Sequence, residues 1–304
     1  MLPVEHKNQR TARASGLASW LRRKSVRRAA GNALSYVLLT AGAIAILIPL
    51  AWMLSTSLKR QIDVFIFPPE WIPPHPQWSN YLTALTYMPF PRYFANTAFI
   101  AGVCIVGELI SCSLVAYGFA RRRAPLRDAL FVLVLSTMML PGQVTLIPLF
   151  ILFRRLGWTD TFLPLTVPAL FGSPFFIFLI RQFFLTISRD LEDAARIDGA
   201  GSLQILVRII MPMATPALAT VAIFSFLFHW NDLMGPLVYL SGSPEKRTVA
   251  LALAFFIGLS TAGPGPLLHV LMAASVVSLV PPLLVFVVAQ RRFVQGFVFT
   301  GVKG

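Results

Sequence analysis

Long stretches without charged side chains divide this sequence and constrain its fold more than any other feature. Five of them cover residues 29–58, 93–120, 129–153, 161–180 and 209–231, interrupted only by Glu108. A bilayer core about 30 Å thick needs about 20 apolar residues, because a helix rises about 1.5 Å per residue. Each stretch therefore predicts one membrane-spanning helix.

A sixth stretch, residues 248–290, is too long for one spanning helix and too short for two. The run Gly-Pro-Gly-Pro at 263–266 divides it, since proline and glycine at that density end a helix. The part before this run is too short to cross and predicts an interfacial or re-entrant segment. We therefore expect an all-α membrane protein with six transmembrane helices within residues 33–290. The expected spans are 33–57, 94–118, 129–152, 162–183, 213–235 and 267–289.

Composition agrees with this fold class. Hydrophobic residues make up 56% of the chain and charged residues only 12%, about half the ~25% of a soluble domain. A soluble globule and a disordered chain are both excluded. The formal charge of +14 would suggest nucleic acid in a soluble protein. Here most Lys and Arg residues fall in the N-terminal segment 1–32, the second and fourth loops and the tail 291–304, so the positive-inside rule places both termini in the cytoplasm.

The basic N-terminal segment leaves two interpretations open. It is either a helix lying on anionic lipid or a poorly ordered tail that carries retention charges. The first apolar stretch is too long for a signal-peptide core, and no small-x-small cleavage site follows it before Lys59. We expect an uncleaved first helix.

Motifs for catalysis and cofactor binding are missing. The five lysines lie outside any Walker context, and neither G-x-S-x-G nor H-E-x-x-H occurs. Cys104 and Cys112 stand eight positions apart, about 12 Å along one helix, which is beyond the reach of a disulfide. We expect no catalytic role, no cofactor and no metal, and no nucleic-acid partner.

Prolines interrupt the expected spans and predict bent helices, because each leaves a backbone carbonyl unpaired. They are Pro49, Pro141, Pro148, Pro164, Pro168, Pro174, Pro216, Pro281 and Pro282.

The loop 187–212 between the fourth and fifth spans has the pattern of a helix–turn–helix. Residues Ile187, Leu191, Ala194 and Ala195 fall on one helical face, and Arg189–Asp193 and Glu192–Arg196 are spaced as i, i+4 ion pairs. Ser188 suits the start of the helix, and Gly199 and Gly201 suit its end and the following turn. Such a helix docks into a groove of a partner or rests on the bilayer surface.

This loop resembles the EAA loop of bacterial ABC importer permeases. The family pattern is E-A-A, three residues, G, nine residues and I-x-L-P. The sequence has Asp193-Ala194-Ala195, then Gly199, then Ile209-Ile210-Met211-Pro212. Asp193 replaces the leading Glu of the pattern, and Met211 replaces its Leu. The Asp side chain is shorter than Glu, and Glu192 beside it compensates for that.

The resemblance extends from about residue 33 to the end of the chain. The ordered segments are similar to the maltose-type subfamily of carbohydrate importers. They are "FPPEWIPPHPQWSNYL" (67–82), "MMLPGQVTLIPLF" (138–150), "AARIDGA" (194–200), "PALATVAIFSF" (216–226), "WNDLMGPLVYL" (230–240) and "FVQGFVFTGVKG" (293–304).

This resemblance implies an ABC type I importer permease fold in the inner membrane of a bacterium. It also implies three protein partners: a second permease subunit, a cytoplasmic ABC ATPase dimer that hydrolyses ATP, and an extracytoplasmic sugar-binding protein. The substrate would be a sugar or a related polyol, and membrane lipid would surround the chain. The residues expected in the ATPase-coupling helix are Leu191, Glu192, Asp193, Ala194, Ala195, Asp198 and Gly199.

For the substrate pathway we favour Trp230 and Asn231, because aromatic rings stack on sugars and amides bind hydroxyl groups. An interfacial anchor is the competing interpretation for Trp230. Asn96 and Glu108 are weaker candidates, and for Glu108 a hydrogen-bonded contact between helices is the favoured interpretation. His229 and Asp232 lie near the outer end of the fifth span. We further hypothesise that residues 248–266 contact the docked binding protein.

Three alternative functions differ in class. An ion-coupled secondary carrier for a small polar solute would need acids near the midplane, where only Glu108 clearly lies. An intramembrane enzyme would need a nucleophile–base spacing, and a scaffold would not need the loop 187–212.

Overall fold

The computed structural model describes residues 5–262 and 267–301, and the side chains of residues 31–258 and 267–289. These residues form helices and contain no strand. The longer helices are α1 (Glu5–Ser57), α2 (Ser79–Tyr87), α3 (Phe90–Arg121), α4 (Arg127–Ser136), α5 (Gly142–Arg155), α7 (Pro174–Thr186), α8 (Asp190–Ile197), α11 (Thr215–Asn231), α13 (Val249–Ala262) and α14 (Leu268–Gly301). The short ones are η1 (Gln61–Asp63), η2 (Thr137–Met139), α6 (Leu163–Thr166), η3 (Pro168–Phe171), α9 (Ser202–Ile205), η4 (Leu206–Ile210), α10 (Met211–Met213), α12 (Met234–Tyr239) and η5 (Pro244–Lys246).

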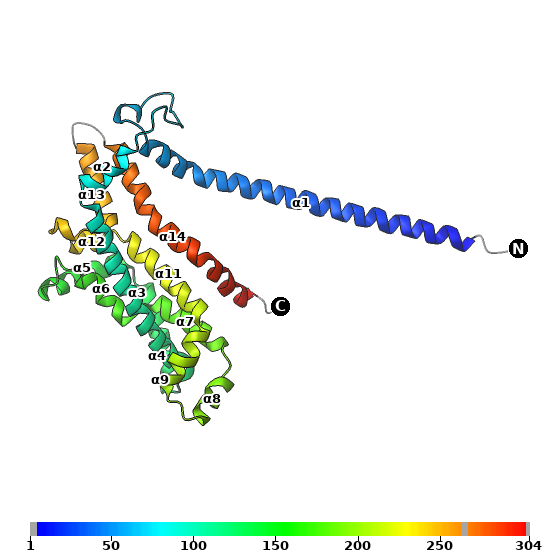
Figure 1. The fold of residues 1–304 in the computed structure, drawn as a ribbon. Coiled ribbons are helices and arrows are strands. Elements are labelled where there is room, and N and C mark those ends of the chain that lie inside the picture. The colour runs from blue at the N-terminus through cyan, green and yellow to red at the C-terminus, as the bar shows by residue number, and fades with distance from the viewer. Residues whose placement is uncertain (1–4, 263–266, 302–304) are drawn as a thin grey trace.

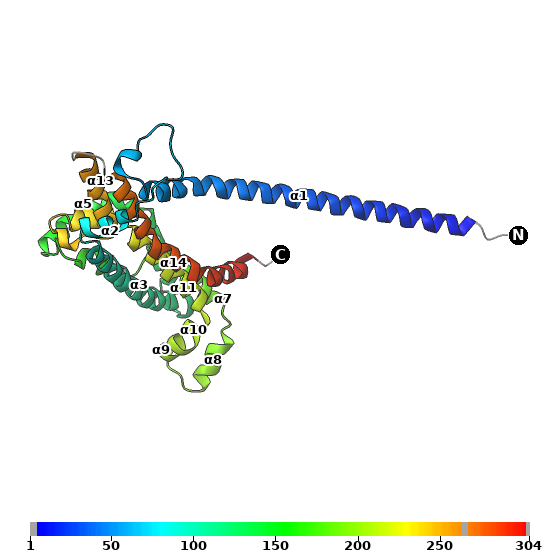
Figure 2. The same cartoon turned by 45° about the horizontal axis from the view of Figure 1, so that its top comes forward.

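Helix α1 extends away from the rest of the molecule (Figures 1 and 2). Its apolar part, Gly31–Ser57, is long enough to cross a membrane, and none of its most apolar window is buried within the chain. The backbone is already helical from Glu5, so the first span continues the N-terminal segment without a break.

Helix α3 is the centre of the bundle and packs against α7 and α11. Its buried side carries small residues about four positions apart, among them Cys104, Cys112, Ala116 and Ala120, each at most 1% exposed. Small side chains let membrane helices approach closely. They admit the large residues Ile180 and Phe184 of α7, which are fully buried.

The expected span 129–152 is sharply bent, and the expected span 213–235 begins at a second sharp bend. Helices α4–η2 and α5 meet at 95°, and the arm Ser202–Met213 meets α11 at 80°. Pro141 lies at the first break, which confirms the bend predicted there, whereas Pro216 lies in the first turn of α11, after the second break. Four helices are long and apolar enough to span, and the number reaches six if each bent pair is one span.

The fourth expected span is also interrupted, because α6, η3 and α7 follow one another within residues 163–186. Gly172, between η3 and α7, has a φ of +86°. A side chain there would meet Cys112 Sγ and Ser111 Oγ at 3.2 Å, so glycine satisfies both the backbone and the contact with α3.

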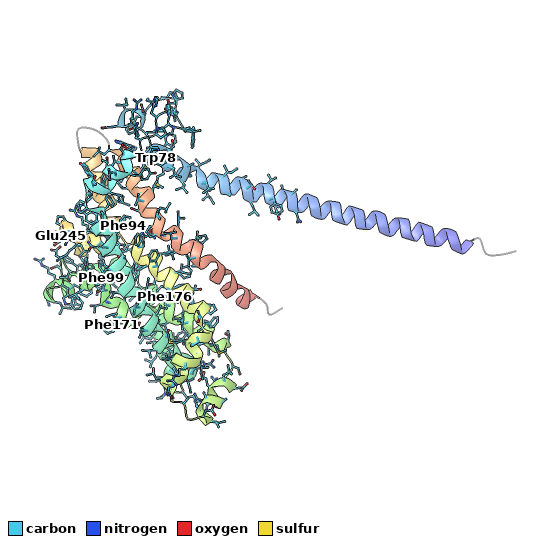
Figure 3. All side chains as sticks on the ribbon, in the orientation of Figure 1. Trp78, Phe94, Phe99, Phe171, Phe176 and Glu245 are labelled. Carbon is cyan, nitrogen blue, oxygen red and sulfur yellow. The ribbon has the colours of Figure 1, made fainter. Side chains whose placement is uncertain are left out.

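A second core lies at the end of the bundle that carries α2 and α13 (Figure 1). Phe90, Tyr93, Phe256 and Ala273 are among its buried residues. Helix α13 is the short apolar segment predicted before Gly263. The run 263–266 itself lies outside the described residues. Figure 3 shows Phe94 and Phe99 along α3, Phe171 and Phe176 further toward the opposite end, and Glu245 on the flank.

Candidate functional site

Helix α8 projects at the end of the bundle opposite α2 and α13 in both views (Figures 1 and 2). The helix begins at Asp190 with Arg189 at the N-cap position, one residue after the predicted Ser188, whose Oγ still accepts the Asp190 N–H at 3.2 Å. The acids Asp190, Glu192 and Asp193 occupy the first turn, where negative charge complements the helix dipole.

Gly199 ends α8 with a φ of +84°. Its N–H donates to the Arg196 carbonyl at 3.0 Å, and the next N–H, of Ala200, donates to the Ala195 carbonyl at 2.9 Å. This pair of bonds is the Schellman motif, which a glycine at the left-handed position stabilises. The predicted helix end at Gly199 is confirmed, whereas Gly201 has an extended backbone and precedes α9.

The structure divides the predicted apolar face of α8. Ala195 is buried together with Glu192, but Leu191 and Ala194 are exposed. Ile197 is 87% exposed and joins them on the outward face. The side of α8 against the bundle therefore carries a carboxylate, and the outward side presents apolar surface.

Glu192 is held by a buried arginine at the end of α3. Its Oε1 lies 2.8 Å from Arg121 Nε, and the two side chains are 3% and 2% exposed. The predicted Glu192–Arg196 pair is present at 3.4 Å, but it is the longer contact. Among the described ion pairs, Asp193 is bound by Arg196 at 2.8 Å and not by Arg189. Asp198 is exposed at the end of the helix.

The second arm of the loop runs back into the bundle. Ser202 of α9 accepts a hydrogen bond from Arg122. Ile205, Leu206 and Ile210 then enter the core formed by α3, α7 and α11. This arm therefore anchors the loop, whereas α8 projects from it.

Trp230 is a packed residue near the C-terminal end of α11. It is 6% exposed, and its Nε1 donates to the Ser278 carbonyl of α14 at 3.2 Å. Its ring lies 5.2 Å from that of Phe226 and 5.8 Å from that of Phe94. These contacts join three helices around the indole.

The other pathway candidates differ in their surroundings. Asn231 is exposed, and its amide donates to the Leu227 carbonyl at 2.7 Å. Asn96 donates to the carbonyls of Glu245 and Arg247, both at 2.9 Å, and so binds α3 to the loop before α13. Glu108 is buried and faces His229 across the α3–α11 contact, with 3.5 Å between Oε1 and Nε2.

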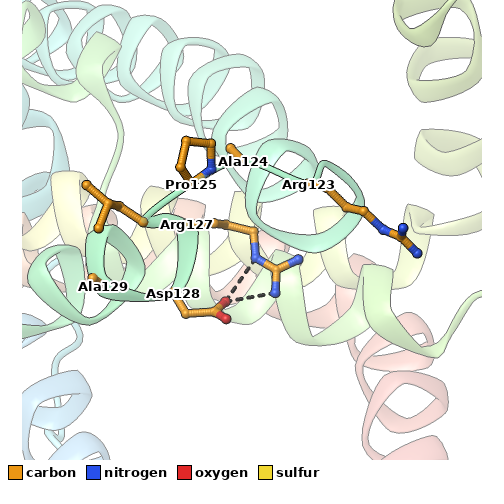
Figure 4. A pocket seen from close by; sticks show the side chains of 7 residues that line it. Arg123, Ala124, Pro125, Arg127, Asp128 and Ala129 are labelled. Atoms are coloured by element: carbon orange, nitrogen blue, oxygen red, sulfur yellow. Dashed lines mark hydrogen bonds and ion pairs between the residues drawn. The ribbon is translucent and has the colours of Figure 1, made fainter.

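A basic opening of about 600 Å³ lies between α3 and α4, lined by residues 123–129. Figure 4 shows Arg127 paired with Asp128, while Arg123 points away from this pair. None of the pathway candidates lines the opening. Within the described residues, no group of three His, Cys, Asp or Glu side chains is placed to hold a metal.

Comparison with known proteins covers nearly the whole chain. A family model described as "Binding-protein-dependent transport system inner membrane component" matches residues 110–297. The osmoprotective compounds uptake permease protein GgtD of Synechocystis is 35% identical over 225 residues, 74% of each chain. The sulfoquinovosyl glycerol transport system permease protein SmoH of Agrobacterium fabrum is 31% identical over 297 residues, 96% of this chain and 99% of its own.

A solved structure is similar over most of the fold. It is the crystal structure of a bacterial ABC transporter involved in the import of the acidic polysaccharide alginate. The match has a TM-score of 0.76 and 28% identity, and it covers 86% of this chain and 95% of that one.

Proposed function

This chain belongs to the family of binding-protein-dependent transport system inner membrane components, and from that premise we propose that it is a permease subunit of an ATP-driven sugar importer. It is a bacterial multi-pass inner-membrane protein. The chain forms half of the translocation pathway beside a second permease subunit. It does no chemistry itself, since ATP is hydrolysed on the partner ATPase dimer.

The observation that carries the proposal is the outward face of α8. Leu191, Ala194 and Ile197 are exposed at the tip of the bundle, while Glu192 fixes the opposite side. An apolar strip on a short anchored helix suits a groove in a partner protein. We assign that groove to the ATPase, so that Asp193, Asp198 and Gly199 lie at the rim of the interface and the loop 187–212 couples the two subunits.

The topology proposed here has six spans, in which α4–η2 and α5 together form the third and α11 forms the fifth, with both termini in the cytoplasm. The tip carrying α8 then lies on the cytoplasmic side, and α2 and α13 lie on the outer side. An extracytoplasmic binding protein delivers the sugar to this outer side, where residues 248–262 lie beside α2. The remainder of the hypothesised contact, 263–266, is outside the described residues.

For the pathway, Asn231 is the strongest candidate because it is the exposed residue of the favoured pair. Trp230 and Asn96 are held by hydrogen bonds to Ser278 and to the loop at Glu245 and Arg247, so we assign them a packing role beside the pathway. Glu108 lies behind them, against His229. Relatives whose printed names carry different solutes share about a third of this sequence, so the sugar is best identified by thermal-shift screening of the cognate binding protein.

The test is the matched pair Ile197→Asp and Ile72→Asp. Both isoleucines are almost equally exposed, at 87% and 86%, but Ile72 lies in the loop after α1. A charge on the docking face should abolish co-purification of the ATPase subunit with the permease, and Ile72→Asp should leave it intact. Retention of the ATPase by Ile197→Asp would contradict the coupling role. Sugar uptake that follows an ion gradient without any ATPase would favour a secondary carrier instead.

A further inference from the structure

We infer that the consecutive arginines Arg121 and Arg122 are positioning residues that fasten both arms of the coupling loop to α3. Through them, α8 and α3 move as one rigid body. The inference rests on the proposed function, because it concerns how a displacement of the docked α8 reaches the membrane. We call the two arginines the α3 clamp.

The first half of the clamp joins three elements through one guanidinium group. Arg121 Nε lies 2.8 Å from Glu192 Oε1 of α8. Its Nη2 donates to the carbonyls of Phe184 at 2.5 Å and Ile187 at 2.7 Å. These carbonyls belong to the C-terminal end of α7 and the residue after it, where a cation is favoured by the helix dipole. A guanidinium can serve three acceptors at once because its donors form a rigid fork.

The second half holds the other arm. Arg122 donates to Ser202 Oγ, at the first position of α9. Side chains on both arms of the loop are thus bound by neighbouring residues at one end of one helix. Because Arg121 and Glu192 are shielded from water, their attraction is screened far less than that of a surface pair.

The clamp explains why a carboxylate faces inward on α8. A buried Glu costs free energy unless it is paired, and an apolar residue would pack there without that cost. Apolar contact alone would also permit α8 to slide, because it has no directional bonds. The buried Glu192–Arg121 ion pair fastens α8 to α3 at one point, and the two carbonyl bonds fasten the end of α7 to the same guanidinium group.

The experiment measures the distance between α8 and α3 by spin-label spectroscopy on the full complex with its ATPase. Labels are placed on Arg189→Cys at the start of α8 and on Val106→Cys in α3, which are both exposed, whereas native Cys104 and Cys112 are buried. The probe is MgATP with vanadate against no nucleotide. We expect the distance distribution in the parent to be unchanged by nucleotide. In Glu192→Gln it should shift and broaden with nucleotide, because α8 follows the ATPase while α3 lags.

A second variant tests whether the shift in Glu192→Gln arises from misfolding and not from loss of the ion pair. Arg121→Met with Glu192→Met replaces the pair by apolar side chains of similar reach, a change that proteins often tolerate. We expect this complex to assemble and to show the same nucleotide-dependent shift. The control Asp128→Asn removes an acid that is 76% exposed, outside the clamp, and should behave as the parent.

The outcomes separate this inference from the proposed function. If Ile197→Asp releases the ATPase but both clamp variants keep the parent's nucleotide-independent distance, α8 is a coupling helix and the clamp is refuted. A parent complex whose distance itself changes with nucleotide also refutes it. If Ile197→Asp leaves the ATPase bound, the proposed function fails first, whatever the clamp variants do.

Discussion

Glu108 Oε1 lies 3.5 Å from His229 Nε2 where α3 packs against α11, and the two side chains are only 7% and 10% exposed. Charged and polar groups at membrane depth are costly unless they meet one another. The pair therefore links the central helix to the helix that follows the coupling loop. His229 is also adjacent to Trp230, so the link lies close to the proposed pathway.

We predict strong non-additivity for this pair. His229→Leu leaves the Glu108 carboxylate buried without the imidazole and should destabilise the chain by about 3 kcal/mol. Glu108→Leu with His229→Leu should cost less than His229→Leu alone, since no polar group is then left behind. Thermal unfolding of the detergent-solubilised complex measures both. A double variant whose loss equals the sum of the single losses would contradict the direct contact.

Substitution of Trp230 should lower mainly the stability of the protein, whereas substitution of Asn231 should lower mainly sugar uptake. Trp230→Phe keeps the ring packing and loses the bond to Ser278, at a cost of about 1 kcal/mol, and Trp230→Ala should cost about 3 kcal/mol or more. Asn231→Ala should leave the unfolding temperature unchanged, because the residue is exposed, and should lower uptake of the identified sugar. Uptake and unfolding temperature are measured on the same preparations. Unchanged uptake in Asn231→Ala would remove it from the pathway.

Lys59 provides a pH-dependent prediction. Its side chain is 1% exposed and its ammonium group lies 4.1 Å from the centre of the Trp52 ring. Burial lowers the pKa of Lys59 from its ordinary value of 10.5, opposed by the charges of Glu70 and Asp63. Between the folded and unfolded pKa values the unfolded chain binds more protons, so the residue's contribution to stability rises with pH.

The measurement compares the parent with Lys59→Met. The unfolding temperature of the parent relative to this variant should rise as the pH increases toward 10.5, because the buried ammonium loses its proton at a lower pH than the same group in the unfolded chain. A difference that stays constant over this range would show that burial does not disfavour the charged form of Lys59.

The sequence predicts those features of the fold that depend on residues close together in the chain better than those that depend on distant contacts. The apolar stretches and the turn at Gly199 follow from local rules, namely span length and the need for a left-handed residue. The 95° bend is only partly predictable: Pro141 marks its place, but its angle depends on packing.

The clamp lies beyond local rules. In the sequence, Arg121 is only one of several charges that orient the chain. Its partner Glu192 lies 71 positions later and in a different loop, so the sequence alone does not pair the two residues. Periodicity places Ala195 beside Leu191 on one face, yet the structure buries Ala195 and exposes Leu191. A helical wheel shows which residues share a face but not which face meets the bundle, and here a buried arginine decides that.

Gly199 offers the sharpest test of the coupling loop. Its φ of +84° suits glycine, and no atom lies within 4 Å of the position that a Cβ would take there, so a substitution acts through backbone strain and charge. Asn and Asp tolerate this conformation about equally, at a cost of about 1 kcal/mol or less. Gly199→Asp also adds a negative charge beside Asp198. We expect Gly199→Asp to lose stimulation of ATPase activity by the loaded binding protein and Gly199→Asn to retain most of it. Equal loss in both would assign the effect to the turn, and full stimulation in Gly199→Asp would exclude the turn from coupling.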